Sequence, residues 1–200
     1  MYDFSVSDIC AVMVKKGYAV FTNDISPYNL NIVGIRAEDP KVNSFNDVIN
    51  VFWHYKGNLN VVKMCCTTLA GLYYLENPCN PKGCAILKAG QYRSTYEIGL
   101  HNGKYEALCQ RLGEVTVYRD DDKDVNYDMI DATEETGYFG INIHRANAKD
   151  ESPDVNTWSA GCQVIQNPHN FDVFMQICRE SSEIWGNSFT YTLLDESDFE

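Results

Sequence analysis

The first stretch of the chain in which hydrophobic positions repeat regularly begins after Ser5. Ile9, Val12 and Met13 recur at helical spacing. Ser5, followed by an aspartate three residues later, is typical of the capping box that begins a helix. Two lysines and a glycine close the stretch, where basic residues face the negative end of the helix dipole. The pattern predicts a helical extension within residues 1–25.

From residue 31 onward, the hydrophobic residues occur in short runs that are rich in β-branched and aromatic side chains. Glycine, asparagine and proline residues separate these runs and indicate turns. The expected strands cover residues 31–35, 48–53, 59–64, 71–75, 84–87, 96–100 and 115–118. Many short strands with little helix between them favour a sandwich or a barrel over alternating strands and helices.

Two later segments depart from this pattern. Residues 119–137 are strongly acidic and are expected to form a surface loop. Residues 170–185 have hydrophobic positions at helical spacing, with Asn170 as the expected N-cap, and residues 189–193 follow as a closing strand. No repeat or linker is evident, so we expect one mainly β domain over residues 1–200.

Composition and charge exclude some classes of function. Two hundred residues are enough to bury a core without disulfides. Sixteen basic and 28 acidic residues give a net charge of −12. This balance argues against nucleic acid or an anionic membrane surface as a partner, because both favour lysine and arginine. No run of residues is apolar for long enough to predict insertion into a membrane.

The N-terminal residues and the cysteines bear on the compartment. We see no basic and apolar leader at the start of the chain, so we expect synthesis in the cytoplasm without an export signal. The eight cysteines are therefore expected to be free thiols. Their spacing includes no CxxC pair, and the acidic run at residues 120–124 lacks the glycine and distal glutamate of an EF-hand loop. We expect neither a metal nor a cofactor.

The candidate chemistry begins in the segment that ends at His144. Ile141 and Ile143 alternate there with Asn142 and His144. On a strand, this alternation sends the isoleucines to one face and the two polar side chains to the other.

A cysteine follows His144 eighteen residues later. Cys162 ends the sequence Trp-Ser-Ala-Gly-Cys, which begins at Trp158. Small residues before a cysteine let an acyl group approach the backbone, and successive N–H groups there could face a developing oxyanion. An imidazole near the thiol would activate it as a nucleophile. The pattern predicts Cys162 as nucleophile and His144 as base.

These residues resemble a known family. The string Ser159-x-Gly161-Cys162, preceded by His144 on a strand, is similar to the signature of the L,D-transpeptidase catalytic domain of the YkuD type. A second similarity lies upstream, in the threonine- and tyrosine-containing segment at residues 67–75. Together the two motifs cover roughly residues 58–166.

The resemblance implies a fold, a reaction and roles for particular residues. It implies a YkuD-like β-sandwich, here with an N-terminal and a C-terminal helix, and acyl transfer on peptidoglycan stem peptides through a thioester on Cys162. It also implies that His144 is the base and that a backbone carbonyl orients it, for which Arg145 is the candidate. Ser159 and Gly161 complete the catalytic motif.

This sequence departs from the family at several positions. Ala160 stands where the family usually has histidine, Val164 where it has arginine or asparagine, and Leu69 where it has proline. Without the arginine, we expect hydrolysis of the stem peptide rather than formation of crosslinks. With no export signal visible, a phage-encoded enzyme that is released on lysis or carried in a virion would fit.

The remaining candidates are residues around the motif. His101, at the end of another expected strand, is interpreted as a strand-end or site-lining histidine rather than the base. The residues expected to contact the substrate peptide are Arg145, Asn142, Gln163, Trp158 and Tyr73. The alternative hypotheses are that Cys162 is a buried structural cysteine, and that the chain is an inactive β-sandwich module for binding or for a virion.

Overall fold

The computed structural model describes residues 4–21, 27–130 and 132–200. Its strands are β1 (Asn31–Arg36), β2 (Asp47–Tyr55), β3 (Asn58–Thr67), β4 (Cys84–Leu87), β5 (Gly90–His101), β6 (Tyr105–Gln110), β7 (Val115–Asp120), β8 (Thr133–Gly137), β9 (Ile143–Arg145), β10 (Gln163–Ile165) and β11 (Phe189–Asp195). Its helices are α1 (Val6–Lys15), α2 (Leu72–Glu76), α3 (Pro168–Trp185) and the short 3₁₀ helix η1 (Glu196–Phe199).

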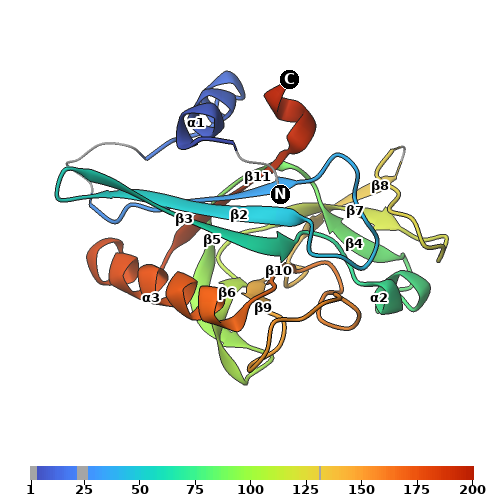
Figure 1. Cartoon of the computed structure of the whole chain (residues 1–200). Helices are drawn as coiled ribbons and strands as arrows, with labels where there is room; N and C mark the ends of the chain where they lie inside the picture. The colour runs from blue at the N-terminus through green and yellow to red at the C-terminus, as the bar shows by residue number, and fades with distance from the viewer. Residues whose placement is uncertain (1–3, 22–26, 131) are drawn as a thin grey trace.

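Eight of these strands form a closed barrel in the order β1-β11-β5-β6-β9-β10-β3-β2. Strands β1 and β11 are parallel, as are β9 and β10, and the other neighbours are antiparallel. Strands β4, β7 and β8 form a separate three-stranded sheet, which lies to the right of the barrel in Figure 1. The expected mainly β class is confirmed. Its architecture is a closed barrel with a small second sheet.

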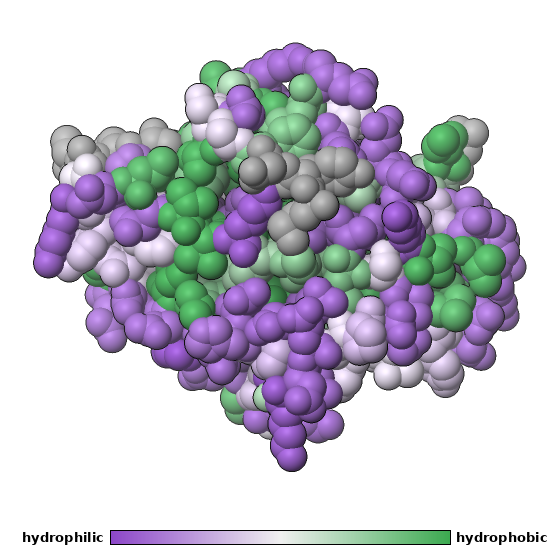
Figure 2. Space-filling model, in the orientation of Figure 1, coloured by the Kyte–Doolittle hydropathy of each residue, from purple (hydrophilic) through white to green (hydrophobic). Residues whose placement is uncertain are grey.

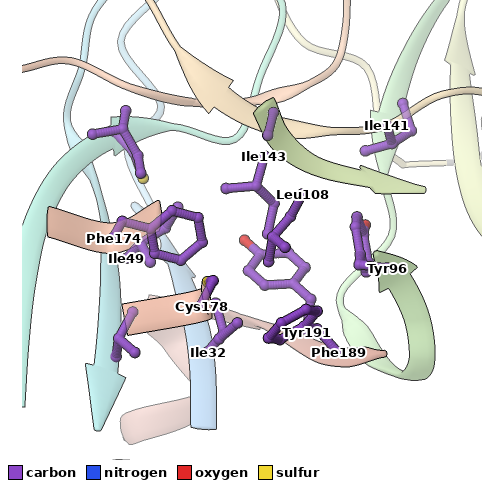
Figure 3. Packing of buried hydrophobic residues seen from close by; sticks show 14 of the residues in the cluster. Ile32, Ile49, Tyr96, Leu108, Ile141, Ile143, Phe174, Cys178, Phe189 and Tyr191 are labelled. Carbon is purple, nitrogen blue, oxygen red and sulfur yellow. The ribbon is translucent and has the colours of Figure 1, made fainter. Parts of the chain in front are cut away.

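The interior of the barrel is filled by side chains from its strands and from α3. Tyr96 and Tyr191 lie at its centre with their rings edge to face, and both are fully buried. Phe174 and Cys178 of α3 belong to the same hydrophobic cluster, as Figure 3 shows. The apolar face expected for the C-terminal helix is therefore the face that packs into the barrel core.

Helix α1 covers the outside of the barrel. Ile9, Val12 and Met13 pack there against side chains of β1, β2 and β11. Strand β1 is therefore buried on both faces, which explains its nearly continuous apolar sequence. The expected capping box at Ser5 is present. The helix itself covers Val6–Lys15, and residues 1–3 and 22–25 of the expected extension lie outside the described residues.

The segment expected as a strand at residues 71–75 is instead the helix α2. The Gly71 carbonyl accepts hydrogen bonds from the N–H groups of Tyr74 and Leu75, and this turns the chain into a helix. Leu75 then packs against Ala70 and Cys84 in a small separate cluster. Local turn bonding and this packing outweigh the β propensity of the two tyrosines.

Two other expectations need correction. The acidic segment 119–137 is not wholly a loop, because it starts in β7 and ends in β8. Glu135 of β8 forms an ion pair with the buried Arg119 of β7 at 2.7 Å, so this acidic side chain helps to hold the two strands together.

The C-terminal helix begins two residues before Asn170, with Asn167 as its N-cap and proline in the first turn. Strand β6 was not expected from the sequence.

The surface in Figure 2 is mostly hydrophilic, with smaller hydrophobic patches between the polar areas. Over the stretches of chain that the structure describes, no helix is both long enough and apolar enough to cross a membrane.

Candidate functional site

The candidate site lies where β9 and β10 run side by side. Gln163 is paired with Ile143 and Val164 with His144, and the N–H of Gln163 donates to the Asn142 carbonyl at 2.9 Å. Ile143 packs into the barrel core, and Gln163 bonds the core residue Tyr191.

The two inward-facing residues, Ile143 and Gln163, fix which way their neighbours on the two strands point. Because side chains alternate along a strand, His144 and Cys162 share the outer face of this strand pair. They are diagonal neighbours on adjacent parallel strands.

A crossover brings the two residues together. Parallel neighbours cannot be joined by a tight hairpin, so residues 146–162 leave the barrel and return. Figure 1 shows this connection in orange, between α2 and α3. It carries the whole Trp-Ser-Ala-Gly-Cys string, and the N–H of Gly71 fastens it to the rest of the protein by donating to the Ser159 carbonyl at 2.9 Å.

Gly161 is required by the path of the chain before the thiol. Its φ of +125° lies in a region that side chains other than glycine rarely adopt, and a Cβ there would lie 2.3 Å from the Ala85 carbonyl oxygen. Strand β4 therefore presses directly against the turn that presents Cys162.

Ser159 organises the same turn from inside. It is fully buried, its hydroxyl donates to the Cys162 carbonyl at 2.9 Å, and it accepts from the Gly161 N–H at 3.1 Å. The serine thus fixes the backbone around the cysteine and does not itself face a pocket.

The hydrogen bonds of His144 define its tautomer. Its Nδ1 lies 2.8 Å from the Arg145 carbonyl oxygen. A carbonyl can only accept, so Nδ1 carries the proton and Nε2 keeps a lone pair. The Tyr105 hydroxyl donates to the same carbonyl at 3.3 Å. The backbone carbonyl of Arg145 therefore orients the ring, and the free nitrogen is able to act as a base.

His101 lies directly against His144. The two rings stack with centroids 4.1 Å apart, and Nδ1 of His101 lies 3.1 Å from the side-chain nitrogen of Asn142. The oxygen of the Asn142 amide accepts from the Gln110 N–H, so its nitrogen must donate to His101. His101 therefore lines the site, as expected, and Asn142 orients it.

Burial keeps both members of the candidate pair neutral at pH 7. It lowers the pKa of His144 to about 3, with a further contribution from His101. It raises the pKa of Cys162 to about 11, although a hydrogen bond from the Asn142 backbone opposes this. The thiol donates to the Gly140 carbonyl oxygen at 3.4 Å rather than to the imidazole. The resting pair is thus a thiol and a neutral imidazole.

Gln110 holds the backbone beside the thiol, a role that was not expected from the sequence. Its buried Oε1 accepts from the N–H groups of Phe139, Gly140 and Ile141 at 2.8–3.2 Å. Its Nε2 donates to the carbonyls of Gly113 and Gly137, both at 3.0 Å. One side chain therefore fixes the position of the Gly140 carbonyl that receives the thiol. A lone glutamine on an alternating strand has no sequence pattern that reveals this.

Two pockets flank the pair. One, of about 400 Å³, is lined by Cys162 together with residues of β4, β7 and the segment 138–141. The other, of about 420 Å³, is lined by His101, Asn102, Lys104, Tyr105, His144, Arg145, Ala146, Thr157 and Trp158. Cys162 and His144 thus open onto different pockets.

The expected substrate-contacting residues separate into two groups. Arg145 and Trp158 line the pocket beside His144. Gln163 does not, because it is fully buried and accepts from the Tyr191 hydroxyl at 2.9 Å inside the barrel. Tyr73 is exposed on α2, where it packs edge to face against Tyr74. Neither Tyr73 nor Asn142 lines either of these two pockets.

Outside this site, carboxylates gather in the acidic segment. Oxygen atoms of Asp120, Asp122 and Asp128 all lie within 4.8 Å of one another. The buried Asp120 accepts from the Asp128 N–H at 3.3 Å, and burial raises its pKa to about 6. The eight cysteines are free and dispersed over the fold.

No family model, curated protein or solved structure matches this chain.

Proposed function

We propose that this protein is a cysteine enzyme that breaks a peptide bond by acyl transfer to Cys162, with His144 as general base. The observation that carries the proposal is the pairing of β9 with β10. It puts the thiol and the imidazole on one face of adjacent strands, and the Arg145 carbonyl leaves His144 Nε2 free to accept a proton.

The proton would follow a simple route. Nε2 of His144 takes the thiol proton as the sulfur attacks the peptide carbonyl, and it then passes that proton to the departing amine. A C–S bond forms and a C–N bond breaks. Water, deprotonated by the same nitrogen, then releases the acyl group as an acid and regenerates the thiol.

The neutral resting pair fits general-base catalysis better than a preformed ion pair. A thiol with a pKa of about 11 has almost no thiolate at pH 7. Deprotonation must therefore accompany attack, after the thiol leaves the Gly140 carbonyl. A substrate that fills the pocket would bring about this change by displacing water and reorienting the sulfur.

The proposed substrate is a peptidoglycan stem peptide, and hydrolysis is proposed over crosslinking. Both rest on the resemblance of the motif around Cys162 to the L,D-transpeptidase catalytic domain and on Val164, which replaces the arginine of that family. Kinship with that family and a phage origin belong to the same proposal.

The decisive experiment looks for the acyl-enzyme. Purified protein is incubated with muropeptides carrying intact stems, and with a carbapenem as a slow acylating mimic, and intact mass is recorded. We expect an adduct that maps to Cys162 and shortened stems in the product. Cys162→Ala removes both adducts, and His144→Ala reduces stem cleavage by about 10²-fold or more.

Matched variants guard against effects on folding. Cys10 is also a partly buried free thiol, but it lies on α1. Cys10→Ala and the exposed His169→Ala should keep the adduct and the activity. An adduct that maps to another cysteine, or activity that survives in Cys162→Ala, would contradict the proposal.

The second candidate is a binding module without chemistry. The bond from the thiol to the Gly140 carbonyl favours it, because this bond directs the sulfur away from His144. Saturable binding of muropeptides with no adduct on Cys162 under any condition would establish this function instead.

A further inference from the structure

The pocket that Cys162 opens onto contains two other cysteines. Cys79 and Cys84 line the same hollow of about 400 Å³. All eight cysteines of the chain lie in the part that the structure describes, and among them Cys79 alone is exposed. The most accessible thiol of the protein therefore shares a pocket with the candidate nucleophile.

The loop that carries Cys79 lies beside the turn that presents Cys162. This loop, residues 77–83, joins α2 to β4. Just before α2, the N–H of Gly71 donates to the Ser159 carbonyl at 2.9 Å, which ties this part of the chain to the turn. Figure 1 shows α2 next to the orange connection that contains the turn.

The far end of the loop is held to the same turn. Cys84, the first residue of β4, directs its thiol to the Ala160 carbonyl oxygen at 3.9 Å. The other two thiols lie near one phenol: burial, followed by the proximity of Cys79 and of Cys162, raises the pKa of the Tyr74 hydroxyl. Cys79 and Cys162 are thus the two thiols of the pocket that face a common space.

These two thiols differ in the way that a peroxide-sensitive pair requires. An oxidant reaches an exposed thiol first, and the sulfenic acid that results condenses with a second thiol nearby. Burial raises the pKa of Cys162, so this thiol carries little thiolate at pH 7 and is oxidised slowly by itself. Cys79 is therefore the site of first attack and Cys162 its partner.

We propose that hydrogen peroxide oxidises Cys79 and that the oxidised Cys79 then forms a disulfide with Cys162. In the first step the peroxide O–O bond breaks, an S–O bond forms on Cys79, and water leaves. In the second step the Cys162 sulfur attacks the Cys79 sulfur, the S–O bond breaks, and the thiol proton leaves with the hydroxide as water. A thiol reductant restores both cysteines.

The loop supplies the movement that this bond needs. A disulfide usually joins Cα atoms about 5.5–6 Å apart. Most residues of the loop 77–83 are exposed, so it can close over the pocket while its two ends stay fixed. The disulfide would cover the pocket and block the nucleophile. That loss of activity rests on the proposed function, whereas the disulfide itself needs only the two thiols.

The test oxidises the reduced protein under mild conditions. The full chain, at micromolar concentration, is treated with a small excess of hydrogen peroxide and studied by intact mass and peptide mapping without reductant. We expect a monomer that is lighter by two hydrogen atoms, with the Cys79 peptide joined to the Cys162 peptide. Acylation of Cys162 by a carbapenem should fall at least about tenfold and return with dithiothreitol.

Single-thiol variants identify the partners. Cys79→Ser should form no crosslink, and its Cys162 should be lost to peroxide at least about tenfold more slowly than in wild type. Cys65→Ser is the matched control, because Cys65 is a partly buried thiol on β3 that does not line this pocket. Cys65→Ser and Cys84→Ser should both form the crosslink at the wild-type rate. Circular dichroism checks that each variant is folded.

The outcomes separate this proposal from the proposed function. A bond from Cys79 to Cys84, a dimer linked through Cys79, or oxidation of Cys79 without any crosslink would each overturn the peroxide-sensitive pair. The peptide map of the wild-type protein decides among these even if a variant fails to fold. A bond between Cys79 and Cys162 in a protein that is never acylated, reduced or oxidised, would support the pair and overturn the proposed function.

Discussion

The imidazole of His101 lies flat against that of His144, with 23° between the ring planes. The contact disfavours a charge on either ring, because protonating one would place a cation against a buried neighbour. His101 therefore helps to keep His144 neutral at pH 7.

Acid should destabilise the fold through His144. Its pKa in the unfolded chain is near 6.5 and in the folded protein about 3. Between these values only the unfolded chain binds the proton, so the free energy of unfolding falls as pH drops through this range. The contribution is at most about 1.4 kcal/mol per pH unit. Urea unfolding of wild type and His144→Gln from pH 7.5 to 4 should show a shallower loss in the variant.

The exposed His169→Gln serves as the control and should follow the wild-type slope. Parallel stability curves for wild type and His144→Gln would show that His144 takes up its proton as easily in the folded state as in the unfolded one.

The thiol of Cys162 should react slowly with iodoacetamide at neutral pH. Its pKa of about 11 leaves little thiolate at pH 7, so the rate of labelling should rise about tenfold per pH unit up to pH 10. The exposed Cys79 should be labelled first. Peptide mapping by mass spectrometry after timed labelling measures both rates. Fast, pH-independent labelling of Cys162 would indicate a thiolate at rest.

Replacing Gln110 with Met should destabilise the protein and disturb the site. The change strands three N–H groups and two carbonyls in a buried position, at a cost of about 3 kcal/mol or more. With the Gly140 carbonyl displaced, the pH at which Cys162 becomes reactive should also shift.

Asn31→Leu is the comparison for Gln110→Met, since Asn31 is also buried and bonded to backbone groups, at Phe21 and Phe52. It should lower stability without moving the pH profile of Cys162. A profile that moves equally in both variants would mean that Gln110 acts through stability alone.

Gly161→Ala should be far more costly than Gly103→Ala. Both glycines have positive φ, but a Cβ on Gly161 meets the Ala85 carbonyl at 2.3 Å whereas a Cβ on Gly103 has nothing within 4 Å. We expect a loss of about 1 kcal/mol for Gly103→Ala and about 3 kcal/mol or more for Gly161→Ala. Thermal unfolding measures the difference. Equal losses of stability would show that β4 shifts at little cost to make room for the added Cβ.

The sequence predicted those helices and strands whose formation depends on a single local residue pattern. The stripe of Ile9, Val12 and Met13 predicts α1 because its packing partner needs only to be apolar. The strand predicted around Tyr73 was wrong because hydrogen bonds to the Gly71 carbonyl outweigh the β propensity of this segment. A short apolar run does not reveal which backbone groups are available to it.

The sequence pointed to two residues that the structure brings together, but it did not reveal the geometry around them. Spacing and small residues pointed to Cys162 and His144, and the structure brings them onto neighbouring strands. Gln163 was expected to contact the substrate, whereas the buried Tyr191 hydroxyl on β11 satisfies it within the barrel. Such a partner, distant in the sequence, leaves no local signal.

Closure of the barrel has a consequence for how the protein acquires activity during folding. The three-residue strands β9 and β10 join the β5–β6 hairpin to the β2–β3 hairpin, and each is held by a partner distant in sequence. Loop-closure entropy delays such long-range pairings, so the hairpins should form before this seam. Until this seam forms, Cys162 and His144 are not held on neighbouring strands, so the chemistry proposed for them would have to wait for it.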